Sequence, residues 1–134
     1  MKTLILSFFI LVNFSCDNAD ENSTSQTQSP ILGQWKVTKY EPGFSPTANY
    51  SGEEIKWTFN NDNTVSVVII SGTTTNPTMP LNTTGTFQYV INSTNAITLN
   101  DIIYYYSIQG NELIIRTEID VSADGKKLTF AKIQ

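Results

Sequence analysis

Hydrophobic and polar residues alternate along most of the chain after residue 30, with turn-forming residues every eight to twelve positions. The alternation is clearest in "EIKWTF", where Ile55, Trp57 and Phe59 fall on one face and polar residues fall on the other. A period of two is the pattern of a half-buried strand. No segment shows the period of an amphipathic helix, so we expect an all-β fold. The pattern predicts eight strands, at about 33–40, 54–60, 64–71, 84–91, 95–100, 102–109, 112–119 and 127–133.

The lengths of the connections predict how these strands are arranged. The second, fourth and sixth connections are tight, at 60–63, 92–95 and 109–111, whereas the first and third are long, at 41–52 and 72–83. In an up-and-down meander, even connections lie at one end and odd ones at the other. Closing such a sheet into an antiparallel barrel removes its exposed edges. An eight-stranded barrel is either filled by side chains or holds one small ligand, and the sequence leaves both alternatives open.

The first sixteen residues resemble an export signal. Met1-Lys2 is followed by the apolar run "TLILSFFILVNF", which is too short to span a bilayer and is typical of a secretory signal. The run ends at Ser15-Cys16, and Cys16 is the only cysteine. This arrangement resembles the lipobox of bacterial lipoproteins, which implies that Cys16 is acylated and anchors the chain to a membrane. The alternative is an ordinary signal peptide in which the cysteine has no such role.

The polar stretch after the cysteine, "DNADENSTSQTQSP", holds too little apolar surface to form a core. We therefore expect a signal peptide at 1–15, a lipidated cysteine with a flexible acidic tether at 16–30, and one β-barrel domain at 31–134. The acidic residues after Cys16 resemble the surface-export signal of Bacteroidetes lipoproteins. That resemblance implies the cell envelope, at the outer membrane and exposed at the surface; the alternative is a merely solvated linker.

Charge and composition exclude several function classes. The chain carries 8 basic and 12 acidic residues, a net charge of −4, and it has no histidine. A slightly acidic domain without a basic patch argues against nucleic acid as a partner. The lack of histidine removes the commonest general base and most zinc sites. Glu53 and Glu54 are adjacent on a strand and would point to opposite faces. We therefore expect no enzymatic activity, no metal and no cofactor.

Several segments together resemble a known family. Gly33-x-Trp35 begins the first strand, "KWTFNNDNTVSV" and "GTFQYVIN" follow, and "KLTFAKI" closes the chain. These segments resemble the lipocalin (calycin-type) pattern and, more closely, the small lipocalin-like lipoprotein domains of Bacteroidetes. The resemblance implies that Trp35 packs across the closed end of the barrel, against a basic residue of the last strand. Lys132 is the candidate for that residue, and Gly33 would allow a close backbone crossing.

The candidate ligand contacts are aromatic or apolar. In "IIYYYSI", Tyr104 and Tyr106 share a face with Ile102 and Ile108 and are expected to point inward. Loop residues at the open rim complete the candidate set: Phe44, Tyr50, Met79 and Leu81. The alternative for the two inner tyrosines is a purely structural role in the core.

Two functions follow from these alternatives. One is a lipid-anchored, lipocalin-like protein that binds a small hydrophobic or amphipathic ligand at the open rim. The other is a cell-envelope module with a filled barrel, whose loops contact another envelope protein or a glycan.

Overall fold

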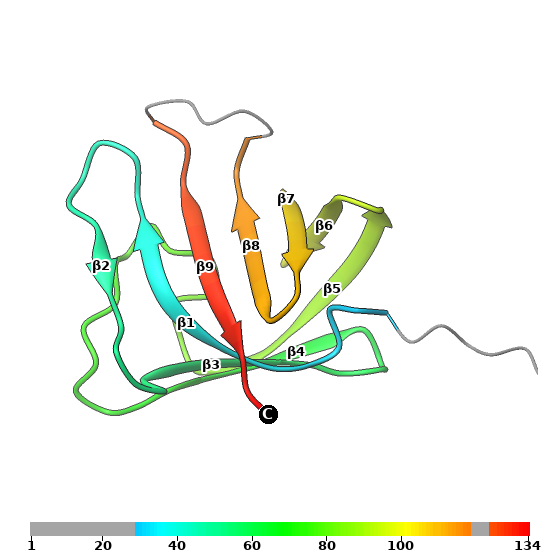
Figure 1. Cartoon of the computed structure of the whole chain (residues 1–134), viewed down its shortest axis with the longest axis horizontal. Helices are drawn as coiled ribbons and strands as arrows, with labels where there is room; N and C mark the ends of the chain where they lie inside the picture. Colours follow the sequence, from blue (N-terminus) through cyan, green and yellow to red (C-terminus); the bar gives the residue numbers. More distant parts are fainter. Residues whose placement is uncertain (1–28, 119–123) are drawn as a thin grey trace, which may run out of the picture.

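The computed structural model of the chain describes residues 29–118 and 124–134, and these contain strands but no helix. The strands pair antiparallel in the order β2-β1-β3-β4-β5-β6-β7-β8-β9, and β9 pairs back onto β1 (Figure 1). This closure confirms the predicted all-β, eight-stranded, up-and-down barrel, which is consistent with a lipocalin-like fold. The strands are β1 (Gly33–Glu41), β2 (Ala48–Asn49), β3 (Ile55–Phe59), β4 (Thr64–Ile69), β5 (Gly85–Ser93), β6 (Ala96–Leu99), β7 (Ile102–Gln109), β8 (Glu112–Arg116) and β9 (Lys127–Lys132).

Each predicted strand has a counterpart, with ends that differ by a few residues. The strand expected at 64–71 ends at Ile69, and the one expected at 112–119 ends at Arg116. Ile119 lies outside the described residues. Strand β2 was not predicted, because two residues are too few to show alternation. It pairs with Lys39 and Tyr40, beyond the point where the pairing of β3 with β1 stops at Lys36.

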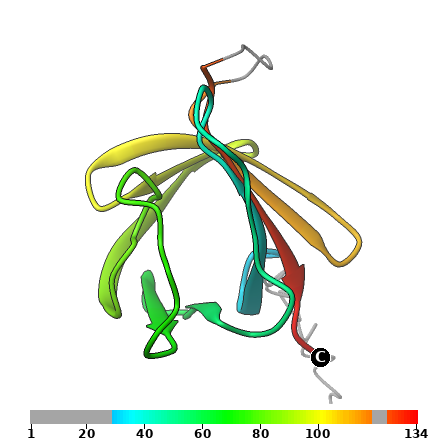
Figure 2. The same ribbon diagram turned by 90° about the vertical axis from the view of Figure 1, so that its left-hand side faces the viewer.

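The long connections lie at one end of the barrel, together with one tight turn, and the other tight turns lie at the opposite end. Figure 2 looks at the end where the segments after β1 and after β4 cross in front of the strands. At that same end, β6 and β7 are joined by Asn100 and Asp101 alone, with φ angles of 47° and 69°. Two successive residues with positive φ form a type I′ turn, which matches the twist of a hairpin. The long connections thus form one rim, as their lengths predicted.

Side chains fill the interior of the barrel. The aromatic rings of Trp57, Phe59, Tyr89 and Phe130 contact one another, with centroids 5.0 Å apart for Trp57 and Phe130 and 5.2 Å for Phe59 and Tyr89. Buried aliphatic residues from β4, β6, β8 and β9 complete a single hydrophobic cluster. Ile102 corrects one expectation: it is 56% exposed, because it begins β7 at the turn from β6, where the strand extends past the core.

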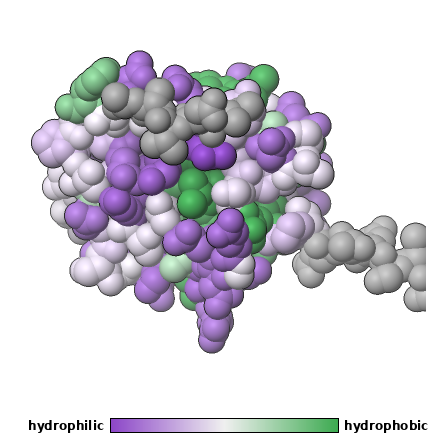
Figure 3. Space-filling model, turned by 45° about the horizontal axis from the view of Figure 1, so that its top comes forward, coloured by the Kyte–Doolittle hydropathy of each residue, from purple (hydrophilic) through white to green (hydrophobic). Residues whose placement is uncertain are grey.

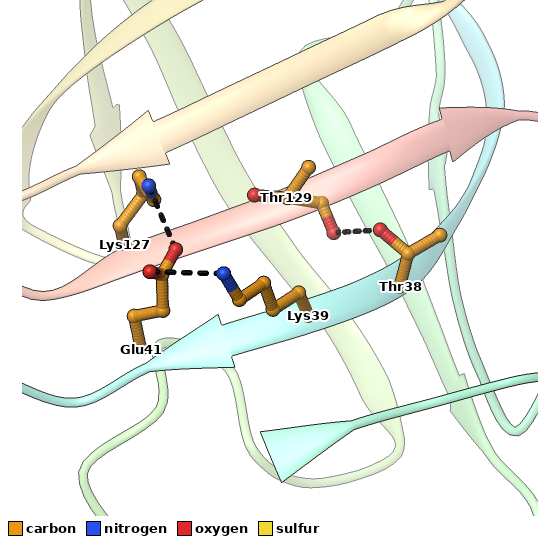
Figure 4. A network of polar contacts seen from close by, with 5 residues as sticks. All are labelled: Thr38, Lys39, Glu41, Lys127 and Thr129. Carbon is orange, nitrogen blue, oxygen red and sulfur yellow. Dashed lines mark hydrogen bonds and ion pairs between the residues drawn. The ribbon is translucent and has the colours of Figure 1, made fainter. Parts of the chain in front are cut away.

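A bulge and a polar network join β1 to β9. The register between the two strands shifts between Val37 and Lys39, so Thr38 is an extra residue in β1. Thr38 Oγ1 donates a hydrogen bond to the carbonyl of Thr129 at 3.1 Å. Glu41 lies opposite Lys127 and pairs with its Nζ at 2.7 Å and with Lys39 Nζ at 3.1 Å (Figure 4). The outer surface of this seam is therefore polar, while the side chains behind it are buried.

Candidate functional site

The closed end of the barrel is built around Trp35. The indole is fully buried and its Nε1–H donates a hydrogen bond to the carbonyl of Ile31 at 2.7 Å. Lys132, directly opposite on β9, places its Nζ 5.1 Å from the centroid of the ring. A cation over an indole face stabilises by about 0.5–2 kcal/mol. Ile31, also fully buried, extends the contact beyond the three residues predicted for this end.

The backbone conformation at position 33 favours glycine. The φ of Gly33, +107°, lies in a region that residues with a side chain rarely adopt. A Cβ at this position would meet only Lys132 Cε, at 3.9 Å, which is an ordinary contact. Glycine is therefore not needed here for the expected close crossing of the backbone. It is needed for the positive φ with which the chain enters β1.

The loop residues predicted to line an open rim separate into two groups. Met79 is only 3% exposed, and Leu81 packs against the core, so the connection between β4 and β5 folds over the mouth of the barrel. Phe44 is 84% exposed and stands apart from them. The structure thus brings Met79, Leu81 and Tyr50 to the covered mouth, but it does not bring Phe44 there.

The inward tyrosines lie beneath this cover. Tyr104 and Tyr106 are 7% and 8% exposed, and burial raises the pKa of both hydroxyls. The nearby Tyr40 raises the pKa of Tyr104 further. Tyr40 itself shares a hydrogen bond with Thr78 Oγ1 at 2.9 Å, which ties the covering loop to β1. Sequence reasoning missed Tyr40, because strict alternation from Trp35 places it on the outer face.

The crevice next to these tyrosines is too narrow to be a binding site. It lies between Tyr40, Tyr104, Ile115 and Leu128, and it has no room for a water molecule. Figure 3 shows the molecule with the top of the Figure 1 view turned toward the reader. Hydrophobic surface appears there in small areas surrounded by hydrophilic residues. An apolar ligand in the barrel would therefore have to displace packed side chains.

A wider cleft opens on the outer side of the rim. It is shallow, with a volume of about 500 Å³, and most of the residues that line it have polar side chains: Asn49, Tyr50, Glu54, Ser71, Gly72, Thr73 and Thr74. Two segments form it, one leading into β3 and one following β4. Of the predicted ligand contacts, only Tyr50 lies here. The run of hydroxyl residues after β4 is visible in the sequence, but the pattern does not show that it meets Asn49 and Glu54.

Hydrogen bonds hold the cleft together. Glu54 Oε2 accepts a hydrogen bond from the backbone N–H of Gly52 at 2.8 Å, which fixes the carboxylate beside its own loop. The Tyr50 hydroxyl donates to the carbonyl of Thr74 at 3.4 Å and so bridges the two segments. Burial raises the pKa of Tyr50, and the charges of Tyr40 and Glu54 raise it further. Tyr50 therefore stays a neutral donor and acceptor at neutral pH.

Other kinds of site are absent from the part of the chain that the structure describes. No group of three or more acidic, cysteine or histidine side chains within 29–118 and 124–134 is arranged to hold a metal ion. Across these same residues, no helix has the length and apolarity needed to cross a bilayer. Cys16, the predicted lipid attachment point, lies outside the described residues.

Two comparisons with known proteins bear on this arrangement. A search of protein-family models found no match to the chain, and a search of curated proteins found none either. The fold and the cleft are therefore the observations on which a function can be argued.

Proposed function

We propose that the chain is a non-enzymatic binding module of the cell envelope that takes a hydroxyl-rich ligand, such as the end of a glycan, in the rim cleft. The observation that carries this proposal is a filled barrel beside a polar cleft of about 500 Å³. That volume falls within the usual range for ligand sites, about 300–1,000 Å³. The lining offers amide, hydroxyl and carboxylate groups beside apolar surface.

The chemistry of the lining fits a saccharide better than a hydrophobic molecule. Sugar hydroxyls both donate and accept hydrogen bonds, and so do the side chains of Asn49, Ser71 and Thr73. Glu54 adds an acceptor whose charge strengthens hydrogen bonds from hydroxyl donors. Tyr50 is only 9% exposed and its hydroxyl already bonds to the carbonyl of Thr74, so little of its ring is available to a ligand. Polar recognition, rather than stacking, would dominate.

Anchoring through Cys16 belongs to the same proposal. The resemblance to a lipobox supports a membrane attachment at that residue, and the resemblance of the acidic stretch after it to a surface-export signal supports the outer membrane. The described chain begins at Ser29, close to the closed end that Trp35 occupies. The rim cleft lies at the opposite end, so an anchored domain would present it away from the membrane surface.

Nuclear magnetic resonance titration with neutral and acidic oligosaccharides tests the proposal. Saturable shifts should centre on Asn49, Tyr50 and Ser71–Thr74. Glu54→Gln should raise the dissociation constant about tenfold, because it weakens a charged hydrogen bond. Glu112→Gln is the matched control: it removes an exposed carboxylate at the start of β8 and should leave binding unchanged.

A second titration separates this proposal from the hydrophobic-ligand alternative. A fluorescent fatty-acid analogue should show no saturable uptake, because the interior is occupied by side chains. Saturable uptake of the analogue, without any response to saccharides, would contradict the proposed ligand class and favour an amphipathic ligand.

A further inference from the structure

The charged residues of the strands lie on one side of the barrel only. Strands β1, β3, β8 and β9 all carry charged residues, whereas β4, β5, β6 and β7 carry none. We call the first four strands the charged half and the last four the uncharged half. Asp101, in the turn between β6 and β7, is the one charged residue anywhere from Thr64 to Asn111.

The outer face of the uncharged half exposes hydrophobic side chains. Val90 of β5 is 56% exposed and Ile103 of β7 is 60% exposed. The two are aligned across the sheet, since Val90 is opposite Thr98 of β6 and Thr98 is opposite Ile103. Ile91 and Ile102 are 36% and 56% exposed, but they alternate with Val90 and Ile103 and belong to the inner-facing side of their strands. The outer row of Val90, Thr98 and Ile103 therefore carries no charge.

Strand β5 also has an unpaired backbone edge. It pairs with β4 only through Gly85–Gln88, and its remaining length pairs with β6 alone. Tyr89 donates its N–H toward β4, to the carbonyl of Asn63, whereas the carbonyl of Gln88 accepts from Asn100 on the opposite side. Because backbone groups alternate in direction along a strand, the N–H and C=O of Ile91 point to the side where β4 has ended.

Among the described residues, the space along this edge is open. A groove of about 290 Å³ runs there, between Val90 and Ile91 on one side and Ser29, Leu32, Asn61 and Asn63 on the other. Proteins usually guard an exposed edge with lysine, proline or a bulge. Here the register shift between Ile91 and Ser93 ends the edge, but no lysine or proline lies within β5.

From this edge we propose that two copies of the chain associate through β5, in an antiparallel pair with Ile91 opposite Ile91 of the second copy. In an antiparallel pair, two residues opposite one another exchange both hydrogen bonds. A residue whose N–H and C=O are both free is therefore complementary to itself across a two-fold axis. The pairing would continue the sheet from one barrel into the next.

The charge distribution favours a second copy over a charged partner. A strongly charged partner of either sign would find no countercharge along the β5 edge, because the strands of the uncharged half carry none and Asp101 lies in the turn between β6 and β7. A second copy brings the same uncharged surface to the contact. The exposed Val90 side chains would also approach one another across the pair.

Cross-linking of the full chain in its membrane tests the pairing directly. Opposed residues of this kind have Cα atoms about 5.5 Å apart, within the range that a disulfide spans. Oxidation of Ile91→Cys should therefore give a product of twice the mass. Val68→Cys is the matched control, because Val68 is 47% exposed on β4, away from the free edge. Any background from Cys16 appears equally in both variants.

Sedimentation of the purified full chain in detergent tests the backbone contribution. Ile91→Pro removes the free N–H without breaking a bond to β6 and should raise the dissociation constant of the dimer about tenfold. Ile91→Ala keeps the N–H and should raise it less. The proposal is overturned if the chain sediments as a monomer up to about 100 µM. Equal cross-linking in the two cysteine variants, or cross-linking of Ile91→Cys only to a protein of another mass, overturns it as well.

Discussion

The charged and uncharged halves of the barrel share one interior but differ on the outside. Inside, both halves contribute fully buried residues, such as Trp35 and Ile97, to the same hydrophobic cluster. Outside, the charged half closes on itself through the seam between β1 and β9, with Glu41 held between two lysines. On the uncharged half, Val90 and Ile103 are exposed to solvent, and β5 has a free backbone edge beyond the residues that pair with β4.

This difference shows that a closed barrel can have outer surfaces of different character on its two sides. Closure needs only the alternation of inner residues and the pairing of β9 with β1. The outer residues do not affect closure, so charged residues on one side can favour solubility while uncharged residues on the other side can contact a partner. Asymmetry of this kind places a binding surface on the wall of the barrel, whereas the fold alone would suggest its mouth.

The largest expected effect comes from truncating the shared interior in either half. Trp35→Ala should lower the free energy of unfolding by about 3–5 kcal/mol, and Ile97→Ala by about 2–5 kcal/mol. Because both residues belong to one core, each substitution should shift a single unfolding transition. Urea unfolding followed by tryptophan fluorescence and by amide hydrogen exchange measures both halves. An exchange profile in which β5–β7 opens independently of β1 and β9 would show that the halves are separate units.

Alkaline pH should affect the uncharged half more than the charged half. Three of its inner residues, Tyr89, Tyr104 and Tyr106, have pKa values that burial raises above the usual value of 10.0. Below about pH 10 these hydroxyls are neutral in the folded and unfolded chain, so they leave stability unchanged. Above it the unfolded chain loses protons first, and the free energy of unfolding falls as pH rises.

Tyr89→Phe tests whether a buried tyrosine hydroxyl causes the loss of stability at alkaline pH. The substitution removes the hydrogen bond from the Tyr89 hydroxyl to the carbonyl of Asn60, 2.9 Å long, and should cost about 1 kcal/mol at pH 7. It should also reduce the slope of stability against pH above pH 10. Unfolding curves between pH 7 and 11 give both quantities, and an unchanged slope would place the alkaline sensitivity elsewhere.

The smallest expected effect lies at the seam of the charged half. The hydrogen bond from Lys127 lowers the pKa of Glu41 below its usual value of 4.5, so its contribution is present above that pH and is lost as pH falls through the folded-state pKa. Glu41→Gln should cost under about 1 kcal/mol, and less in high salt. Glu112→Gln serves as the control, and thermal unfolding at pH 7 and pH 4 compares the two. An equal acid response in both variants would contradict the assignment.

Much of the fold is predictable because inner residues alternate regularly in most strands, although β1 departs from the alternation at its bulge. Ile55, Trp57 and Phe59 are all buried, as their spacing predicted, and the short connections are hairpins. Strand β2 escapes prediction, since its pairing depends on where β3 leaves β1 and not on its own two residues.

The candidate site was harder to predict than the fold. Hydrophobicity favoured Phe44, Met79 and Leu81 as ligand contacts, but the same property buries Met79 and packs Leu81 against the core. The polar cleft depends on Asn49 and Thr74 meeting across two loops, and no periodic pattern encodes such a meeting. The free edge of β5 was equally invisible, because it arises from the different lengths over which β5 pairs with β4 and β6.

Thr38 determines which residues of β1 face the interior of the barrel. The extra residue lets Trp35 and Val37 face inward and then returns Tyr40, rather than Lys39, to the same side. If Thr38 were instead paired as an ordinary strand residue, strict alternation would turn Lys39 and Glu41 into the apolar interior and Tyr40 out to water. A single irregular residue therefore keeps two charged side chains out of the core of the first strand.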